Sequence, residues 1–533
     1  MTSRLLGLTL CLCWLTHGVA RATPTRSFVL DSASVLAEGK LEGASVESDG
    51  TIVAGAQTRR ADLKGVISAK SLLPLPDGSA FIGTGNEGKV FLYKDGVAKL
   101  FAETKQLMVA SLARDARGTL YAGTLPKGKI FAIDPKGQVR EFCSPPGAQH
   151  IWALVYDDKQ KTLFAATGPE GKVFAIDPSG KAEVYYDGED SHVMSLVKAQ
   201  DGSLYAGTSD RALLLHLRGV NRADVVYDFD GNELTALAIA NGEIAVVANL
   251  FPKTTASKLP TPTPGGDANS PLASVLAAAV ATANNSERPQ AGKGQLYRVG
   301  RDGRVEHMFT ADEGHLTSVE WGDDGTIVVG TGRDGHIHRI RMDHSHALLV
   351  DVDERQVLAM HLSGPHPLFI TGDGAAIYDV LTGPSRKFEW TSKVLDAGNL
   401  ARFGHATWRS RGASSLRTRS GNTDKPDATW SGWSPLLAAG SASAPRAPGG
   451  SSPLTAAGVI ASPSARFLQV QVDLAAADSV VYAIEAFYLP QNQPALISEV
   501  SVEPPRPHNE KPGSQRAPAA SSVYKIKWKV ENP

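Results

Sequence analysis

The stretch that decides the fold is Gly118–Thr124 with Gly128–Gly137, which reads GTLYAGT and GKIFAIDPKG. About one period later the chain repeats it at Thr162–Thr167 and Gly171–Gly180, as TLFAAT and GKVFAIDPSG. Val, Ile, Tyr and Phe are typical of strands. The Asp-Pro-x-Gly segments predict turns, because proline presets φ and glycine accepts a positive φ. A repeat of this size fixes the architecture before any single residue is interpreted.

Each unit contains a short apolar strand that ends in a leucine-like anchor. The anchors are Leu72, Leu112, Leu154, Leu196, Leu237, Val319 and Met360, spaced by 40, 42, 42, 41, 82 and 41 residues. The third unit predicts four strands, at Ile151–Tyr156, Thr162–Ala166, Lys172–Ile176 and Ala182–Tyr186. Four strands per 40–45 residues is the blade signature of a β-propeller. We therefore predict an all-β chain with a seven-bladed β-propeller over residues 23–386.

Two segments complete this ring. The last unit has too few strands after Asp379, and the N-terminal segment Thr51–Gly55 is expected to supply the missing one, which protects exposed strand edges. The double spacing reflects an insertion at residues 253–293, between the second and third strands of the fifth unit. It is rich in Pro, Thr, Ala, Ser and Gly, so it is either a surface loop or a lid over the channel mouth.

The first residues predict export. Arg4 precedes the apolar stretch Leu5–Leu15, and Ala20–Ala22 supplies a cleavage site, so residues 1–22 are a secretory signal peptide. No second apolar stretch has membrane length. Cys143 is then the one cysteine of the mature chain, which favours a bacterial periplasm or cell surface. The net charge of −1 gives no indication of a nucleic-acid partner.

A different β-rich region follows the ring. Residues 387–495 predict a β-sandwich of immunoglobulin, fibronectin or jelly-roll type, with an alternating strand at Phe467–Leu474. Its other predicted strands are Ala406–Arg411, Ser415–Arg419 and Val480–Leu489. Residues 496–533 predict a linker and a final strand at Val523–Val530. That strand either pairs back onto the sandwich or begins a further immunoglobulin-like domain.

Trp430–Ser434 reads WSGWS and resembles the Trp-Ser-x-Trp-Ser box of fibronectin-type receptor modules. The resemblance implies arginines stacked on the tryptophans, and the candidates are Arg409, Arg411, Arg417 and Arg419. Trp430 and Trp433 are either core residues or an exposed aromatic platform for a glycan or protein partner.

Inspection of the chain identifies no catalytic motif, but the repeat itself generates a candidate site. The position four residues before the anchor is polar in five units: His150, His192, Glu233, His315 and Gln356. Equivalent positions in a propeller form a ring at the channel mouth. Three imidazoles, a carboxylate and an amide could hold a divalent metal or an anionic ligand. Alternatively, they satisfy backbone groups at the channel entrance.

The repeat unit resembles those of bacterial secreted propellers over residues 66–383. These relatives are the NHL, gluconolactonase and streptogramin-lyase types and the quinoprotein repeat. The lactonase and lyase types imply a divalent metal held by carboxylates and histidines, whereas this ring has Glu233 as its one carboxylate. We therefore predict an exported, non-enzymatic binding or scaffold protein with no cofactor and a protein or glycan partner in the cell envelope. The alternative is a metal-dependent hydrolase or lyase acting at the channel mouth.

Overall fold

The computed structural model describes residues 24–252, 292–311, 314–381, 387–438, 454–491, 496–503 and 525–531. Strands make up most of this part of the chain, and α1 (Ala33–Ala37) is the one helix in it. Within these ranges, no helix has the length and apolarity needed to cross a membrane. The predicted all-β fold class is confirmed. The predicted signal segment, residues 1–22, and most of the insertion lie outside the described residues.

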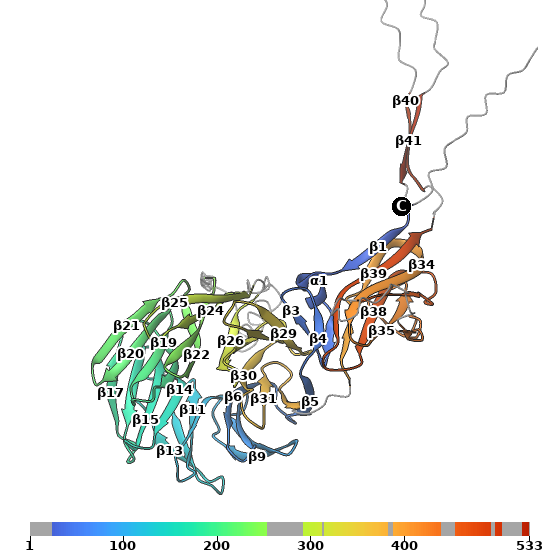
Figure 1. Ribbon diagram of the computed structural model, residues 1–533. Helices are drawn as coiled ribbons and strands as arrows, with labels where there is room; N and C mark the ends of the chain where they lie inside the picture. Colours follow the sequence, from blue (N-terminus) through green and yellow to red (C-terminus); the bar gives the residue numbers. More distant parts are fainter. Residues whose placement is uncertain are drawn as a thin grey trace, which may run out of the picture.

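The repeats fold into four-stranded antiparallel sheets arranged in a ring (Figure 1). In the third unit the strands are β14 (His150–Asp157), β15 (Thr162–Gly168), β16 (Lys172–Ile176) and β17 (Ala182–Asp187). They neighbour one another in chain order, and each contains the strand predicted for it. The first unit consists of β6 (Ala69–Pro74), β7 (Ala80–Thr84), β8 (Lys89–Lys94) and β9 (Val97–Glu103), and the second of β10 (Met108–Arg114), β11 (Leu120–Leu125), β12 (Ile130–Ile133) and β13 (Val139–Cys143). The fourth unit consists of β18 (Val193–Lys198), β19 (Leu204–Thr208), β20 (Leu213–Gly219) and β21 (Arg222–Asp228). The fifth unit consists of β22 (Glu233–Ala240), β23 (Glu243–Leu250), β24 (Lys293–Val299) and β25 (Val305–Ala311).

The unit anchored at Val319 is not a separate sheet. Its strands are β26 (Leu316–Trp321), β27 (Ile327–Thr331), β28 (His336–Ile340) and β29 (His346–Asp351). The outer strand β29 also pairs with β3 (Ala44–Glu47), which joins the unit to a 15-stranded sheet. The described chain thus has six separate blades and one merged unit, so the prediction of seven separate blades is wrong. The physical reason is that an N-terminal strand occupies the otherwise open edge of β29.

An N-terminal strand does complete the last blade, but it is not the predicted one. Strand β5 (Gln57–Asp62) pairs with β32 (Ala376–Leu381) beside β31 (Leu368–Thr371) and β30 (Val357–His361). The predicted segment Thr51–Gly55 instead contains β4 (Ile52–Ala54), which pairs with β3 and β39 (Val480–Pro490). The predicted segment is apolar and reads TIVAG, whereas β5 reads QTRRAD, so apolar strand propensity selects the wrong one of the two.

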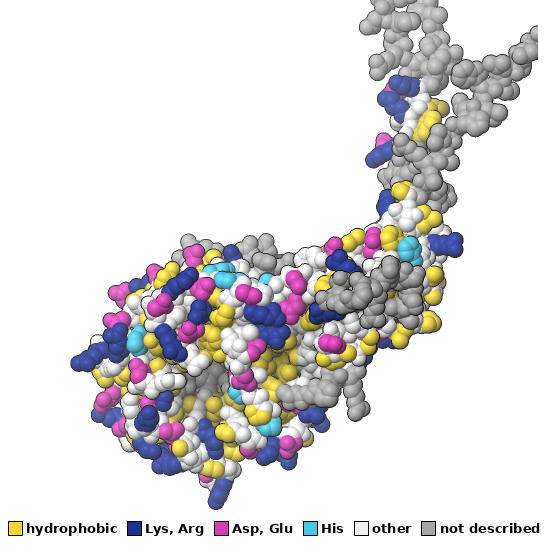
Figure 2. Space-filling view, viewed as in Figure 1, with side chains coloured by type: hydrophobic (Ala, Val, Ile, Leu, Met, Phe, Trp, Pro, Cys, Tyr) yellow, Lys and Arg dark blue, Asp and Glu magenta, His cyan; other side chains and the backbone are white. Residues whose placement is uncertain are grey.

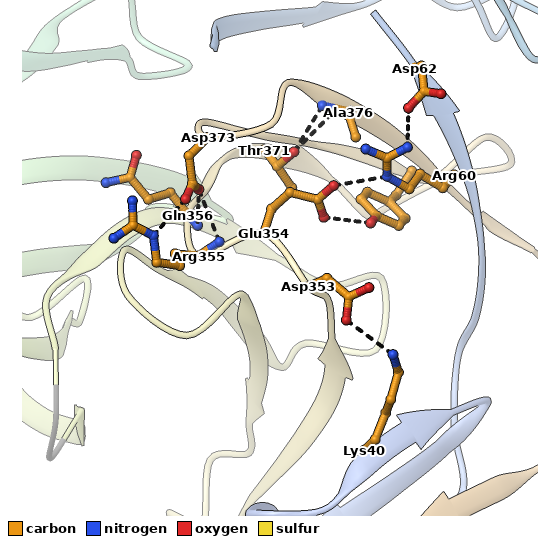
Figure 3. Close-up of polar contacts among 11 residues, drawn as sticks. Lys40, Arg60, Asp62, Asp353, Glu354, Arg355, Gln356, Thr371, Asp373 and Ala376 are labelled. Atoms are coloured by element: carbon orange, nitrogen blue, oxygen red, sulfur yellow. Dashed lines mark hydrogen bonds and ion pairs between the residues drawn. The ribbon is translucent and has the colours of Figure 1, made fainter. Parts of the chain in front are cut away.

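Hydrogen bonds and ion pairs stabilise the position of β5 in the last blade (Figure 3). The buried Glu354 carboxylate accepts a 2.9 Å hydrogen bond from Arg60 Nε and a 2.6 Å bond from the hydroxyl of Tyr378. Nearby, Lys40 Nζ lies 3.1 Å from Asp353, which links the N-terminal segment to the same blade. A charge-assisted bond to a buried carboxylate is stronger than a neutral one, so this contact helps fix the register of closure.

Residues 24–54 and 387–491 form one unit, here called the C-terminal β-domain. Strand β1 (Arg26–Leu30) pairs with β39, and β2 (Lys40–Glu42) pairs with β33 (Glu389–Thr391). Figure 1 shows the blue N-terminal strands among the orange and red C-terminal ones. The predicted propeller range 23–386 thus begins with strands that pair with C-terminal strands, and among them β3 also pairs with β29 of the ring.

The strands predicted in the C-terminal β-domain are present, but they do not form two separate sheets. The domain also contains β34 (Leu395–Arg411), β35 (Ser414–Gly421), β36 (Leu437–Ala438), β37 (Leu454–Val459) and β38 (Ala465–Leu474). The N-terminal part of β34 pairs with β38, and its C-terminal part pairs with β39 and β37. One long, irregular strand thus joins the strands around β38 to those around β39 in a single hydrogen-bonded sheet, and the predicted sandwich is not confirmed.

Two tryptophans form the centre of this domain. Trp390 and Trp408 are fully buried in a core that includes Leu36 from α1. Trp390 Nε1 donates a 2.8 Å hydrogen bond to the carbonyl oxygen of Leu36. A Cβ at Gly39 would lie 2.5 Å from the same nitrogen, so this glycine leaves room for the indole. The N-terminal helix is thereby part of the core of a domain made mostly of C-terminal strands.

The final strand meets a partner that was not predicted. Strand β41 (Lys525–Glu531) pairs with β40 (Leu496–Glu503), and the two form their own sheet beyond the end of the C-terminal β-domain (Figure 1). Of the two alternatives, pairing back onto the sandwich does not occur, and the start of a further immunoglobulin-like domain stays a prediction; part of the predicted linker is a strand. Exposed apolar side chains, Val500 and Val502 of β40 with Ile526 and Trp528 of β41, share one face.

Adjacent blades are joined at the ring by a repeated serine contact. The residue before the anchor is serine in four units, and its Oγ donates to a carbonyl oxygen of the next inner strand. The pairs are Ser71 to Val109 (3.0 Å), Ser111 to Ile151 (3.1 Å), Ser195 to Leu234 (3.0 Å) and Ser318 to Val357 (3.2 Å). Opposite each serine is a glycine: Gly83, Gly123, Gly207 and Gly330. In the other units alanine replaces the serine, and the opposite residues are Ala166, Val247 and Ile370.

Candidate functional site

The inner strands converge at one end of the ring. The first strand of each unit contacts the first strand of the next, and β30 contacts β6, so these strands form a closed circle. Each has a β-bulge at the same place, two residues before the anchor. The bulged residues are Lys70, Ala110, Trp152, Met194, Thr235, Thr317 and Leu358. Because a bulge re-aims a side chain, these residues form a second ring beside the predicted one.

His150 and His192 are brought together by Trp152. The Trp152 indole Nε1 donates a 3.0 Å hydrogen bond to His192 Nδ1. His150 stacks on the indole with ring centres 5.1 Å apart, and the two imidazole centres lie 5.5 Å apart. His150 Nδ1 is buried and has no hydrogen-bond partner among the described residues. The three side chains form a cluster of planar rings with one unsatisfied polar atom.

Burial keeps this cluster uncharged. It lowers the pKa of His150, and the pKa of His192 is lowered first by burial and then by the nearby His150. Since indole Nε1 can only donate, His192 Nδ1 is the acceptor and the ring proton is on Nε2. A metal would need the Nδ1 lone pair that Trp152 occupies or the Nε2 position that the proton occupies. The cluster as folded suits stacking and hydrogen bonding better than metal ligation.

The side chains of three predicted ring residues pack against glycines at the ends of the second strands. An added Cβ would lie 1.8 Å from His192 Nδ1 at Gly168, 2.0 Å from His315 Nε2 at Gly332 and 2.6 Å from Gln356 Oε1 at Gly372. These side chains occupy the space that the missing glycine side chains leave. The contact gives part of the ring a packing role, which is the alternative that the sequence left open.

The rest of the ring does not join the His150 and His192 cluster. Burial raises the pKa of Glu233, whose Oε1 accepts a 3.0 Å bond from Thr235 Oγ1. The ring of His315 lies 5.3 Å from that of Phe251. The backbone NH of Gln356 donates to Asp373 Oδ1 at 3.2 Å, next to Arg355 (Figure 3). In the part of the chain that the structure describes, no three His, Cys, Asp or Glu residues form a group suited to a metal ion.

Sequence reasoning missed the second ring of the mouth. Trp152 carries the cluster, and Lys70 lies at the equivalent position of the first unit, where burial lowers its pKa. The sequence did contain a signal for this ring: the residue two positions before the anchor differs in size and charge from unit to unit, unlike the apolar residues of the repeated packing. Its meaning depends on the bulge, which re-aims one residue and has no local signature here.

The second predicted site is only partly exposed. Trp430 is buried, and its Nε1 donates to Thr423 Oγ1 at 2.8 Å. The Arg419 guanidinium lies 4.6 Å from the Trp433 ring and 5.5 Å from the Trp430 ring, and Arg417 lies 5.6 Å from Trp433. The stacking implied by the Trp-Ser-x-Trp-Ser resemblance is therefore present for two arginines. Trp430 belongs to the core, and an exposed platform would be limited to Trp433.

The serines of this box hold the segment against β35 by hydrogen bonds. Ser431 N donates to the Ser420 carbonyl at 2.9 Å, and Ser420 N donates back to Ser431 Oγ at 3.0 Å. Ser434 and Thr418 make the equivalent pair, at 2.8 and 3.0 Å. The box is hydrogen-bonded along the edge of β35. Its tryptophans therefore have a structural role at this edge.

Charge is mixed over the surface. In Figure 2, Lys and Arg side chains alternate with Asp and Glu over the visible face of the propeller, and no single-sign patch dominates it. This distribution agrees with the net charge of −1.

Comparisons with known proteins give a likeness in strand arrangement. No family model matches the chain, and no curated protein matches it. A solved streptogramin B lyase is 11% identical with a TM-score of 0.48, covering 62% of this chain and 98% of its own. Virginiamycin B lyase from Staphylococcus aureus, solved with quinupristin, is 10% identical with a TM-score of 0.48, covering 61% of this chain and 100% of its own. The WD40 β-propeller domain of Doa1 is 12% identical with a TM-score of 0.44, covering 61% and 97%. At these identities no residue of this chain takes a role from those proteins, and the chain is described by its architecture: a β-propeller ring followed by a separate β-rich domain.

Proposed function

We propose that this protein is an exported binding protein whose propeller holds a planar group of a cell-envelope protein at the channel mouth. The observation that carries the proposal is the cluster of His150, Trp152 and His192, which offers ring faces and one buried, unsatisfied nitrogen. Aromatic side chains are the anchors of most protein interfaces. Export is supported by the signal-like pattern of residues 1–22. A planar partner group would stack on the half-buried rings of this cluster.

Replacing Trp152 by leucine is expected to remove at least nine-tenths of the envelope proteins that the immobilised mature protein retains. The leucine fills apolar space but supplies neither the stacking face nor the indole donor. The measurement is quantitative mass spectrometry of the eluates. The matched control is Trp321→Leu, a tryptophan at the opposite end of an inner strand. If both variants retain the same proteins as the wild type, the channel mouth is not the binding face. Material that is resistant to protease and sensitive to glycosidase would show a glycan instead.

The metal-dependent alternative predicts stoichiometric Zn²⁺ binding at the channel mouth, whereas the binding proposal predicts none. Since His192 Nδ1 accepts from Trp152, we expect no stoichiometric Zn²⁺ binding at the mouth at pH 7. Titration calorimetry on the wild type and on a His150→Ala, His192→Ala double variant measures this directly. Equal, weak heats in both proteins are the expected result. Stoichiometric binding that the double variant loses would bring the hydrolase or lyase alternative forward.

A further inference from the structure

The end of the inner strands opposite the channel mouth carries a second unusual pair, Glu320 and His361. Each lies one residue after its anchor, in two neighbouring units. The same position is apolar in the other five units: Leu73, Ala113, Val155, Val197 and Ala238. Where a repeat places apolar residues, a polar pair has no role in the repeated packing. The departure therefore points to something specific to these two units.

The Glu320 carboxylate is held by three donors. Its Oε1 accepts from His361 Nδ1 at 2.9 Å and from Ser363 Oγ at 2.6 Å, and its Oε2 accepts from Leu362 N at 2.5 Å. Burial alone would raise the pKa of Glu320, but these hydrogen bonds lower it overall, so the group is a carboxylate. The carboxylate accepts the hydrogen bond of His361 Nδ1–H, so the nitrogen left for a ligand is Nε2.

His361 lines a cavity of about 240 Å³ between the last and first units. The lining residues are Pro74, Leu75, Pro76, Gly78, Ser79, His361, Pro365, His366 and Leu368. Prolines and leucines make most of the wall, so it is apolar with a few polar groups. Such a composition is typical of small-molecule sites, and a cavity of about 150 Å³ is already enough for a benzene ring. This cavity has room for one ring with a substituent.

The charges around the cavity disfavour an anionic ligand. Ser79 Oγ donates to Asp77 at 2.5 Å, and Lys94 pairs with the same carboxylate at 3.1 Å. Asp323 accepts a 2.8 Å bond from the backbone NH of Gly364. Together with Glu320, these groups leave an excess of negative charge near His361. An anion would be repelled, whereas a neutral donor meets the lone pair of His361 Nε2.

We propose that this cavity binds a small neutral phenol. The aromatic ring lies between the proline and leucine walls, and the phenol hydroxyl donates its hydrogen bond to His361 Nε2. Glu320 acts as the positioning residue, because it holds the imidazole in the tautomer that accepts at Nε2. The site is separate from the channel mouth and does not depend on the function proposed for it.

The pH dependence follows from the tautomer. The hydrogen bond to Glu320 is the main cause of the raised pKa of His361, with smaller support from the charges of Glu320 and Asp323. Neutral His361 accepts at Nε2, and protonated His361 does not. His366 also lines the cavity, and Asp77 and Lys94 face it through Ser79. Affinity for a phenol is therefore full above the pKa of His361 and falls as pH drops through it.

The test uses 4-methylphenol as the probe and its methyl ether, 4-methylanisole, as the match without a donor. Binding to the mature protein is followed by titration calorimetry at pH 8 and pH 5.5. We expect 4-methylphenol to bind at least tenfold tighter than the ether at pH 8 and to lose most of that advantage at pH 5.5. His361→Phe should abolish the advantage, and Glu320→Gln should reduce it about tenfold, as removal of a supporting partner typically does. His216→Phe, which replaces an imidazole bonded to Ser203 in another blade, should change nothing.

The proposal is overturned if the phenol and the ether bind equally at pH 8, or if His361→Phe binds the phenol like the wild type. It is also overturned if 4-methylbenzoate binds tighter than the phenol at pH 5.5, since that would make protonated His361 a donor to anions. Thermal unfolding of each variant, compared with the wild type, separates loss of the site from loss of the fold.

Discussion

Replacing Trp390 by alanine is expected to lower the free energy of unfolding of the C-terminal β-domain by about 3–5 kcal/mol. The side chain is fully buried, and its Nε1 donates to the carbonyl oxygen of Leu36 at 2.8 Å. Alanine leaves a cavity the size of an indole, and the Leu36 carbonyl oxygen loses the indole bond and keeps only the 3.1 Å bond from the backbone NH of Gly39. Both costs arise where α1 meets the C-terminal strands. Denaturant unfolding with a probe on each domain measures the loss and shows which transition moves.

Trp390→Phe is the control for this experiment. The phenyl ring keeps most of the apolar volume but has no donor for Leu36, so the expected loss is smaller, about 1–3 kcal/mol. Equal losses for alanine and phenylalanine would assign the whole effect to the hydrogen bond. A loss confined to the propeller transition would contradict the placement of residues 24–54 in the C-terminal β-domain.

The second large effect is expected at Gly123, opposite Ser111 in the second blade. A Cβ there would lie 2.4 Å from Ser111 Oγ and 2.5 Å from Ile151 Cγ2, and Ile151 belongs to the next blade. Both distances are too short, so Gly123→Ala must displace the contact that joins two blades. Overpacking of this kind typically costs about 1–3 kcal/mol, and more where two elements must separate. Thermal unfolding of the ring gives the measurement.

Two further variants make this prediction specific. Ala166→Gly removes a methyl group at the equivalent position of the third blade, where Ala153 faces it, and should cost about 1 kcal/mol or less. Ser111→Ala combined with Gly123→Ala removes the clash with Ser111 Oγ and should recover part of the lost thermal stability. The clash with Ile151 remains and accounts for the rest of the loss. If Gly123→Ala unfolds like the wild type, the inter-blade contact is looser than the distances indicate.

The sequence predicted the blades well because their signals are local. Apolar alternation and Asp-Pro-x-Gly turns act within one unit, and the unit recurs. The serines and glycines of the inter-blade contacts are visible in the sequence, since Gly123 lies within Gly118–Thr124, but their role depends on the neighbouring blade. Closure by an N-terminal strand was predicted at the wrong strand, because β4 is apolar and β5, which follows after Gly55 and Ala56, reads QTRRAD and lacks an apolar strand pattern.

The candidate site was predicted in part for a similar reason. The position of His150 and His192 at the strand starts follows from the repeat. Their engagement with Trp152 depends on a bulge, which is a property of the folded strand pair. The pair of Glu320 and His361 could have been found by comparing one position across all units, since the other five are apolar there.

The pairing of β1 and β2 with β39 and β33 has a consequence for synthesis. The propeller is an insertion within the C-terminal β-domain, since the chain enters that domain first, leaves it for the ring and returns to complete it. Strand β5 likewise waits for β32, more than 300 residues later. At a ribosomal rate of about 5–20 residues per second, β5 remains without its partner for roughly 15–60 s and β1, about 450 residues before β39, for roughly 20–90 s. The inner blades can fold as they emerge, whereas the two structures that finish the molecule form last and together.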